Sequence, residues 1–133
     1  MLRCGIDLIE HERIAEGIAS LGERFLRRFF TEGERADCRD QPHRLAARLA
    51  AKEAVAKALG TGIGDVRWVD IEIRVDNPRK RPILYLHGAA AQLAHELGLH
   101  AWDVSLSHSR TTACAVAVAF GPCRQEAQGD ELA

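Results

Sequence analysis

An alanine-rich segment in the middle of the chain predicts a long helix, from about residue 44 to residue 59. Alanine has the highest helix propensity, and this segment contains neither glycine nor proline. At about 100° per residue, most of its alanines fall within one arc, so this side of the helix can approach another surface closely. These alanines are Ala46, Ala47, Ala50, Ala51, Ala54 and Ala58. A helix of this kind is expected to pack on a surface that also carries small side chains.

The last predicted strand, residues 111–120, offers such a surface. Successive side chains of a strand point to opposite faces, and one face of this strand carries only alanine. The residues of that face are Ala113, Ala115, Ala117 and Ala119. Short links at Ser109-Arg110 and Asn77-Pro78 are typical of hairpins. We therefore expect an α+β fold, in which a mostly antiparallel sheet packs against the alanine-rich helix.

Helical and strand patterns alternate along the rest of the chain. Apolar residues at helical spacing predict a helix over residues 10–21, and a second short helix carries Phe25, Phe29 and Phe30. Thr31 and Glu34 form a capping-box pattern, which predicts a third short helix to about residue 39. A further helix is expected over residues 88–97. Strands are expected at residues 2–7, 66–76, 82–87 and 101–108.

The composition favours one folded domain without a special partner class. The 133 residues are 47% hydrophobic and 28% charged, with a net charge of −1, so a nucleic-acid or membrane partner is not indicated. We expect a domain over residues 1–121 and a polar C-terminal tail over residues 122–133. The sequence shows neither a membrane-spanning run nor a signal pattern, and its four widely spaced cysteines favour free thiols, so a cytoplasmic location is expected.

Three charged side chains are candidates for the chemistry. Asp7 closes the first predicted strand, while Glu53 and Lys57 lie one turn apart on the long helix and share a face. Two carboxylates on rigid elements beside a lysine are suited to holding Mg²⁺ and a phosphorylated ligand. On spacing alone, however, an ordinary surface pair is the better description of Glu53 and Lys57, and Asp7 by itself is described as a capping or turn residue.

A glycine-rich loop and a histidine complete the candidates. Gly60, Gly62 and Gly64 follow the long helix, where they form either a helix cap with a flexible loop or a close approach to a ligand. Their loop follows a helix rather than preceding one, unlike the common phosphate-binding fingerprints. His108 ends a strand, as either a turn residue or a base or phosphate contact. A serine hydrolase is poorly supported, since there is no Gly-x-Ser-x-Gly elbow.

Taken in order, these segments resemble a known family. The resemblance rests on residues 5–10, 13–14, 30–34, 48–64 and 104–108, of which the Lys-Glu-Ala run at residues 52–54 with its glycine loop is the most specific. The chain looks like a holo-[acyl-carrier-protein] synthase, a family of small, single-repeat 4′-phosphopantetheinyl transferases. The resemblance covers residues 2 to about 120. One departure is the segment 77–82, Asn-Pro-Arg-Lys-Arg-Pro, where the family often has a Gly-Lys-Pro turn.

The resemblance implies the 4′-phosphopantetheinyl transferase fold and a reaction. Members of the family move 4′-phosphopantetheine from coenzyme A to a serine of apo-acyl carrier protein and release 3′,5′-ADP, in support of fatty acid biosynthesis. Asp7 and Glu53 would hold Mg²⁺, and Glu53, directly or through a bound water, would accept the serine proton. Lys57, Arg48, His108 and the three glycines would bind coenzyme A, with Lys57 on a phosphate. The three glycines are Gly60, Gly62 and Gly64.

The resemblance also implies partners. Acyl carrier proteins are acidic beside their modified serine, and Arg13, Arg24 and Arg28 would meet that surface, while Arg27 and Arg35 are equally well described as solvated charges. The resemblance further implies a homotrimer with shared coenzyme A sites, and the sequence gives partial support, because apolar strand residues remain on faces that the helices do not cover. These residues are Ile71, Ile73, Val75, Val116, Val118 and Phe120. Alternatives are a non-catalytic carrier-binding module and a nucleotide-binding regulatory domain.

Overall fold

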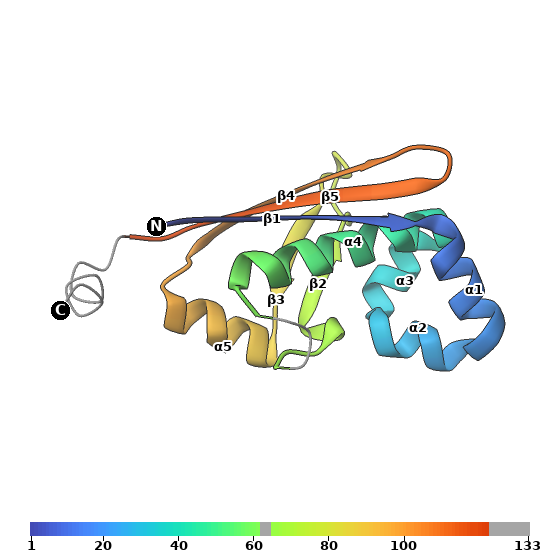
Figure 1. The fold of residues 1–133 in the computed structure, drawn as a ribbon, viewed down its shortest axis with the longest axis horizontal. Helices are drawn as coiled ribbons and strands as arrows, with labels where there is room; N and C mark the ends of the chain where they lie inside the picture. The colour runs from blue at the N-terminus through green and yellow to red at the C-terminus, as the bar shows by residue number, and fades with distance from the viewer. Residues whose placement is uncertain (62–64, 123–133) are drawn as a thin grey trace.

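The structure, a computed structural model, describes residues 1–61 and 65–122. Figure 1 shows a sheet lying across one long helix, with smaller helices at either end of that helix. The helices are α1 (His11–Leu21), α2 (Glu23–Phe29), α3 (Glu32–Cys38), α4 (Pro42–Leu59), the short 3₁₀ helix η1 (Trp68–Asp70) and α5 (Gly88–Leu97). The strands are β1 (Leu2–Glu10), β2 (Ile71–Arg74), β3 (Ile83–Leu86), β4 (Ala101–His108) and β5 (Thr112–Phe120).

The main sheet has three antiparallel strands in the order β1-β5-β4. The sequence prediction ended β1 too early, at residue 7, because β1 pairs with β5 from Leu2 to Glu10 without interruption. Asp7 therefore lies inside a strand, opposite Ala115, and is neither a cap nor a turn residue. Its backbone is fixed by strand pairing, and its side chain is held toward the helix layer.

Helix α4 packs on the inner face of this sheet, as the alanine pattern predicts (Figure 1). The four alanines of β5 are all buried, and so are the alanines of the helix arc. The closest approach is at Gly5 of β1, where a Cβ atom would lie 1.9 Å from the Ala54 carbonyl oxygen. Only glycine fits at this position, which lies two residues before Asp7 and against the turn that carries Glu53.

A separate two-stranded antiparallel sheet, β2-β3, crosses behind α4 in the view of Figure 1, and its strand β3 contacts β4 of the main sheet. The predicted strand over residues 66–76 is wrong in extent, because Trp68–Asp70 form the 3₁₀ helix η1 and only Ile71–Arg74 pair. The prediction of an α+β fold with antiparallel sheets is confirmed, but these strands divide into two sheets.

Helix α3 is joined to α4 and β2 by a buried ion pair. The capping box of Thr31 and Glu34 begins α3 as predicted, and the Glu34 carboxylate then accepts from Lys52 Nζ at 2.7 Å and from the Ile73 N–H at 2.9 Å. Lys52 also donates to the carbonyl oxygens of Trp68 and Ile71. Helical spacing puts Lys52 on one stripe of α4 with Arg44 and Arg48, but Lys52 is fully buried.

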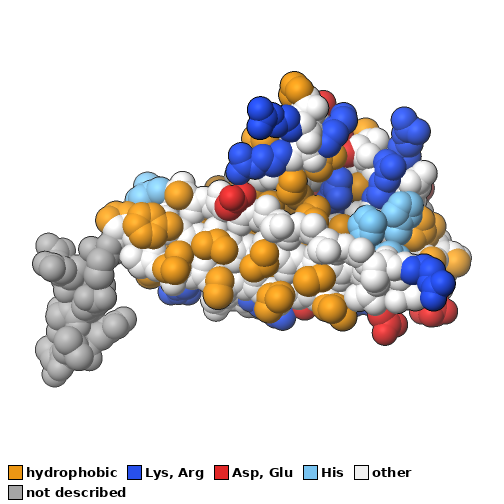
Figure 2. Space-filling view, turned by 90° about the horizontal axis from the view of Figure 1, so that it is seen from above, with side chains coloured by type: hydrophobic (Ala, Val, Ile, Leu, Met, Phe, Trp, Pro, Cys, Tyr) orange, Lys and Arg blue, Asp and Glu red, His pale blue; other side chains and the backbone are white. Residues whose placement is uncertain are grey.

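The outer face of the main sheet is apolar and uncovered. Figure 2 shows a row of hydrophobic side chains along it. The exposed apolar residues of β1 and β5 are Leu2, Ile6, Leu8, Val116, Val118 and Phe120. The expectation of an uncovered apolar face is thus confirmed for β5 and extends to β1. It is wrong for Ile71 and Ile73, which are fully buried beneath the α-helices.

The two ends of the described chain meet at the end of the sheet. The Met1 ammonium donates to the Gly121 carbonyl at 2.6 Å, and the Gly121 N–H donates to the Met1 carbonyl at 3.0 Å. The predicted tail, residues 122–133, lies outside the described residues beyond Pro122. Cys4, Cys38 and Cys114 are free thiols. In the described part of the chain, no helix has the length and apolar character to span a membrane.

Candidate active site

Three predicted residues meet where β1 crosses α4. Lys57 Nζ lies 3.1 Å from Asp7 Oδ1 and donates to the Ile6 carbonyl at 2.8 Å. Glu53, one helical turn before Lys57, interacts with the Asp7 carboxyl group. The side chain of Asp7 is 18% exposed and that of Lys57 is 57% exposed, so the lysine can reach a ligand in solvent. The surface-pair description of Glu53 and Lys57 is therefore incomplete, because a second carboxylate joins them.

The two carboxyl groups disturb one another's protonation. Burial and the neighbouring Asp7 carboxylate raise the pKa of Glu53 to about 7. Burial acts to raise the pKa of Asp7 as well, but its contacts with Glu53 and Lys57 outweigh burial and leave that pKa below its ordinary value. Two close carboxylates cannot both ionise easily without a cation beside them. Lys57 supplies only part of that neutralisation in this structure.

The residues at this point fit a magnesium ion. Asp7 Oδ2 is buried and has no hydrogen-bond partner among the described residues, so this carboxylate oxygen is available as a ligand. The described residues contain no cluster of three or more His, Cys, Asp or Glu side chains arranged for a metal. Mg²⁺ commonly uses one or two carboxylates, with waters and substrate phosphates as the other ligands. Asp7 and Glu53 match that pattern.

A second group of candidates lines a cavity of about 1020 Å³, which we call the basic cavity. Arg48 and His108, both predicted to bind coenzyme A, lie in its wall. Arg48 is only 8% exposed, and its buried Nε has no hydrogen-bond partner among the described residues. The charge of Arg48 acts on the Asp37 carboxylate in the same wall, where it contributes to lowering the pKa of Asp37. The unpartnered Nε makes Arg48 a candidate contact for an anionic ligand.

Sequence reasoning missed most of the charge in this cavity. The further basic residues of its wall are Arg39, His43, Arg44, Lys80 and Arg81. They come from the end of α3, the start of α4 and the β2–β3 turn, so no single segment reveals the cluster. The run Arg79-Lys80-Arg81 was the available signal. Burial, then Arg44, His11 and His108, lower the pKa of His43, whose ring lies edge-on to His108.

The carboxylate pair and the basic cavity lie on different sides of α4. Arg48 and Glu53 are five residues apart, which turns the helix by about 140° and advances it by about 7.5 Å. The described wall of the basic cavity includes Arg44, Ala47 and Arg48 but not Glu53 or Lys57. The structure therefore brings the predicted site residues together as two groups rather than as one.

The glycine loop is only partly described. Gly60 caps α4 in the left-handed conformation, with φ of +78°, and its N–H returns to the Ala56 and Lys57 carbonyls. This agrees with the helix-cap description of Gly60. Gly62 and Gly64 lie outside the described residues, so their predicted contact with coenzyme A stays a prediction.

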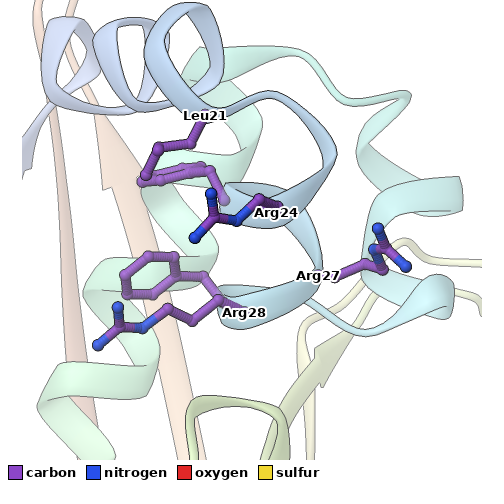
Figure 3. A pocket seen from close by; sticks show the side chains of 6 residues that line it. Leu21, Arg24, Arg27 and Arg28 are labelled. Carbon is purple, nitrogen blue, oxygen red and sulfur yellow. The ribbon is translucent and has the colours of Figure 1, made fainter.

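The predicted docking arginines lie on α1 and α2. Figure 3 shows Arg24 and Arg28 extending to the same side of α2, near Leu21, while Arg27 points to the other side. All three arginines of α2 line a shallow groove of about 500 Å³, together with Leu21, Phe25 and Phe29. Arg35, by contrast, forms ion pairs with Glu23 and Asp40.

Arg13 lies elsewhere, on α1, and its charge acts to lower the pKa of Glu53. Of the three predicted docking arginines, Arg13 is the one whose charge acts on the pKa of Glu53. The predicted carrier surface therefore adjoins the predicted chemistry.

Comparison with known proteins gives this geometry a family. Residues 3–117 match the model of the 4′-phosphopantetheinyl transferase superfamily. A holo-[acyl-carrier-protein] synthase of Herpetosiphon aurantiacus is 50% identical over 128 residues, covering 91% of this chain and all of that protein. The chain belongs to the holo-[acyl-carrier-protein] synthases. A synthase of this family from Chlamydia trachomatis is 46% identical, covering 90% of this chain and 99% of that protein.

Solved structures of holo-[acyl-carrier-protein] synthases share the fold. The Helicobacter pylori synthase in complex with coenzyme A has a TM-score of 0.80 at 30% identity, covering 88% of this chain and 99% of that chain. The Bacillus anthracis synthase in complex with coenzyme A, described as 3′,5′-ADP, has a TM-score of 0.73 at 35% identity, covering 90% and 96%. The expectations of the family, of a transferase enzyme and of its fold are confirmed.

Proposed function

We propose that this chain transfers 4′-phosphopantetheine from coenzyme A to a serine of apo-acyl carrier protein and releases 3′,5′-ADP, in support of fatty acid biosynthesis. The observation that carries the proposal is the joining of Asp7, Glu53 and Lys57 at one point, with an unneutralised basic cavity on another side of the same helix. Coenzyme A carries a pyrophosphate and a separate ribose phosphate, so one substrate presents anions to both places. A cytoplasmic location stays a prediction.

The chain's own residues can position the reactants of a phosphoryl transfer. Such reactions depend mainly on orientation and on neutralising charge. Asp7 and Glu53 would hold Mg²⁺, which when bound neutralises pyrophosphate oxygens. Lys57, on its exposed stem, would release Asp7 and contact a phosphate as a point charge. We assign Glu53 as the group that accepts the serine proton, because it adjoins Arg13 on the proposed carrier surface.

The test is a transfer assay read by mass. The protein is incubated with coenzyme A, Mg²⁺ and apo-acyl carrier protein, and the carrier is weighed. A gain equal to one phosphopantetheine group, abolished by a chelator and restored by Mg²⁺, is the expected result. A carrier that binds but keeps its mass would instead indicate a non-catalytic binding module. Nucleotide binding without carrier binding would indicate a regulatory domain.

We propose that apo-acyl carrier protein docks on Arg13, Arg24 and Arg28. The groove beside α2 combines three cations with the apolar side chains of Phe25 and Leu21, which suits an acidic, amphipathic helix. Arg28 also lies 5.4 Å from the ring of Phe29, which helps to hold its direction.

Charge reversal at Arg13 and Arg28 is expected to raise the KM for the carrier at least about tenfold, because like charges then face one another. The KM for coenzyme A should change little. Steady-state kinetics with each substrate varied in turn measures both values. Arg79→Glu is the control, since Arg79 is an exposed cation on the β2–β3 turn and is not part of this groove. An unchanged carrier KM in the double variant would contradict this docking surface.

We also propose that three copies of the chain assemble through the outer face of the main sheet. Six large apolar side chains of β1 and β5 are between 36% and 70% exposed there. A contiguous apolar face of this kind is unusual on a monomer and suits contacts within a closed cyclic assembly. Figure 2 shows that Lys, Arg and His side chains flank this face. A neighbouring subunit's carboxylate pair could thereby meet the basic cavity.

Light scattering at micromolar concentration is expected to give three times the chain mass. Val118→Glu places charges on the shared face and should give smaller species with little transfer activity. Tyr85→Glu is the control, because Tyr85 is also exposed and apolar but lies on β3. Co-expression of Arg48→Gln and Glu53→Gln chains should recover activity that neither has alone, if sites are shared. A monodisperse monomer with full activity would overturn the assembly.

A further inference from the structure

The turn between β2 and β3 holds a lysine in a conformation suited to glycine. Lys80 has φ of +55°, in the left-handed region. Asn77 clamps this turn, since its side-chain amide donates to the Arg81 carbonyl at 2.7 Å and its side-chain oxygen accepts from the Arg81 N–H at 3.0 Å. The Lys80 N–H donates to the Asn77 carbonyl at 3.0 Å. A lysine at this position costs conformational energy that glycine would not. Backbone conformation therefore does not explain why a lysine occurs here.

Lys80 lies in the wall of the basic cavity, and the charges there are unbalanced. Arg39, Arg44, Arg48 and Lys80 form no ion pair with any residue in the described part of the chain. The two carboxylates of the cavity wall are already engaged, Asp37 by Arg74 and Asp103 by Arg81. Arg39 is a second cation in the left-handed conformation at this cavity, with φ of +53°. The cavity thus collects cations beyond what its own carboxylates neutralise.

The proposed function decides which anion this excess serves. The bond that breaks is in the pyrophosphate of coenzyme A, so the pyrophosphate must lie at Asp7, Glu53 and Lys57. The ribose phosphomonoester is then the anion left for the basic cavity, and at neutral pH a phosphomonoester carries between one and two negative charges. Arg48, buried and lacking a partner for Nε, belongs to the same cavity wall.

We propose that Lys80 is a specificity-determining residue that contacts the ribose phosphomonoester of coenzyme A. This inference rests on the proposed function. Lysine reaches a phosphate as a mobile point charge, and its flexible stem spans from the turn into the cavity. The hydrogen bonds of Asn77 fix the backbone of the turn, and therefore the point from which the Lys80 side chain extends. Lys80 thereby favours coenzyme A over dephospho-coenzyme A, which lacks this phosphate.

Lys80→Gly is a suitable test, because glycine relieves the left-handed backbone and the variant should melt no lower than the wild type. The first readout is calorimetric binding of adenosine 3′,5′-bisphosphate and of adenosine 5′-monophosphate, which needs no transfer reaction. The variant is expected to lose about tenfold in affinity for the bisphosphate relative to the monophosphate, as for one charge-assisted hydrogen bond. The second readout is the ratio of kcat/KM for coenzyme A to that for dephospho-coenzyme A, which should fall by a similar factor.

Two variants serve as controls. Arg79→Gly removes the same charge from the same turn, but Arg79 is not part of the described cavity wall, so the preference for the bisphosphate should change less than about twofold. Lys80→Arg should retain most of the preference. Equal loss for both nucleotides, or an equal effect of Arg79→Gly, would overturn the inference. A wild type that binds the bisphosphate through Lys80 yet transfers nothing would refute the proposed reaction and leave this inference standing.

Discussion

Glu53→Gln and Asp7→Asn are each expected to reduce transfer at least about 100-fold while leaving the fold intact. Removing one group that neutralises charge in a preorganised site typically costs 10²–10³ in kcat, or about 3–4 kcal/mol. The fold should tolerate both changes, because neither carboxylate closes a core contact and their mutual crowding raises the pKa of Glu53 to about 7. Loss of either negative charge relieves that repulsion.

The measurements are transfer rate against Mg²⁺ concentration and melting temperature with and without Mg²⁺ and coenzyme A. A ligand that binds only the native state raises its stability, so the wild type should melt higher with both present. The two variants should lose most of this increase. Glu16→Gln is the matched control, since Glu16 is exposed on α1. Turnover close to that of the wild type at limiting Mg²⁺ in either variant would remove the metal assignment.

Breaking the buried pair of Glu34 and Lys52 is expected to cost about 3–5 kcal/mol of unfolding free energy, the largest effect on stability that we anticipate. Both side chains are 0% exposed. The three donors of Lys52 are all used, on Glu34 Oε1, Trp68 O and Ile71 O. Burial lowers the pKa of Lys52, and Glu34 acts in the opposite direction. Either charge left alone would remain desolvated without compensation.

Urea unfolding of Lys52→Met and Glu34→Gln at one fixed protein concentration measures this cost. The double variant should lose less than the sum of the two single losses, because it buries no unpaired charge. Arg27→Met is the control, as Arg27 and Glu23 form an exposed pair at 3.9 Å that contributes at most about 0.5 kcal/mol. Single losses below about 1 kcal/mol would show that the pair contributes little to holding α3 on α4.

The sequence predicted what local pattern determines and missed what long-range contact determines. The span of α4, the Thr31 capping box and the alanine face of β5 follow from propensity and periodicity, and all are confirmed. The burial of Lys52 does not, because its partners come from α3, η1 and β2. Helical periodicity places Lys52 on the same side of α4 as Arg48, but it does not show which elements cover the Lys52 side chain.

The residues of the candidate site also divide into those that the sequence indicates and those that only the folded chain brings together. Asp7, Glu53 and Lys57 were found through their chemistry and the family resemblance, and their convergence needed only one strand and one helix. The basic cavity needed four separate elements, and its two wall carboxylates are already paired, Asp37 with Arg74 outside the wall and Asp103 with Arg81 within it. Asp37 is held by Arg74 and by the Val75 N–H, a fact that only the folded chain contains. Charge counted along the sequence could not show that Arg39 and Lys80 remain unbalanced.

The alanine contact between α4 and β5 has a consequence for how this protein can vary. Ala115 lies opposite Asp7 in the sheet and is 1% exposed beneath the helix that carries Glu53. A larger side chain there would push α4 away and separate two carboxylates without changing any charged group. Substitutions that reduce activity should therefore also be found at these alanine positions, which never touch a substrate. In a mutational scan scored by activity, these alanines would be as intolerant of replacement as the acids they help to align.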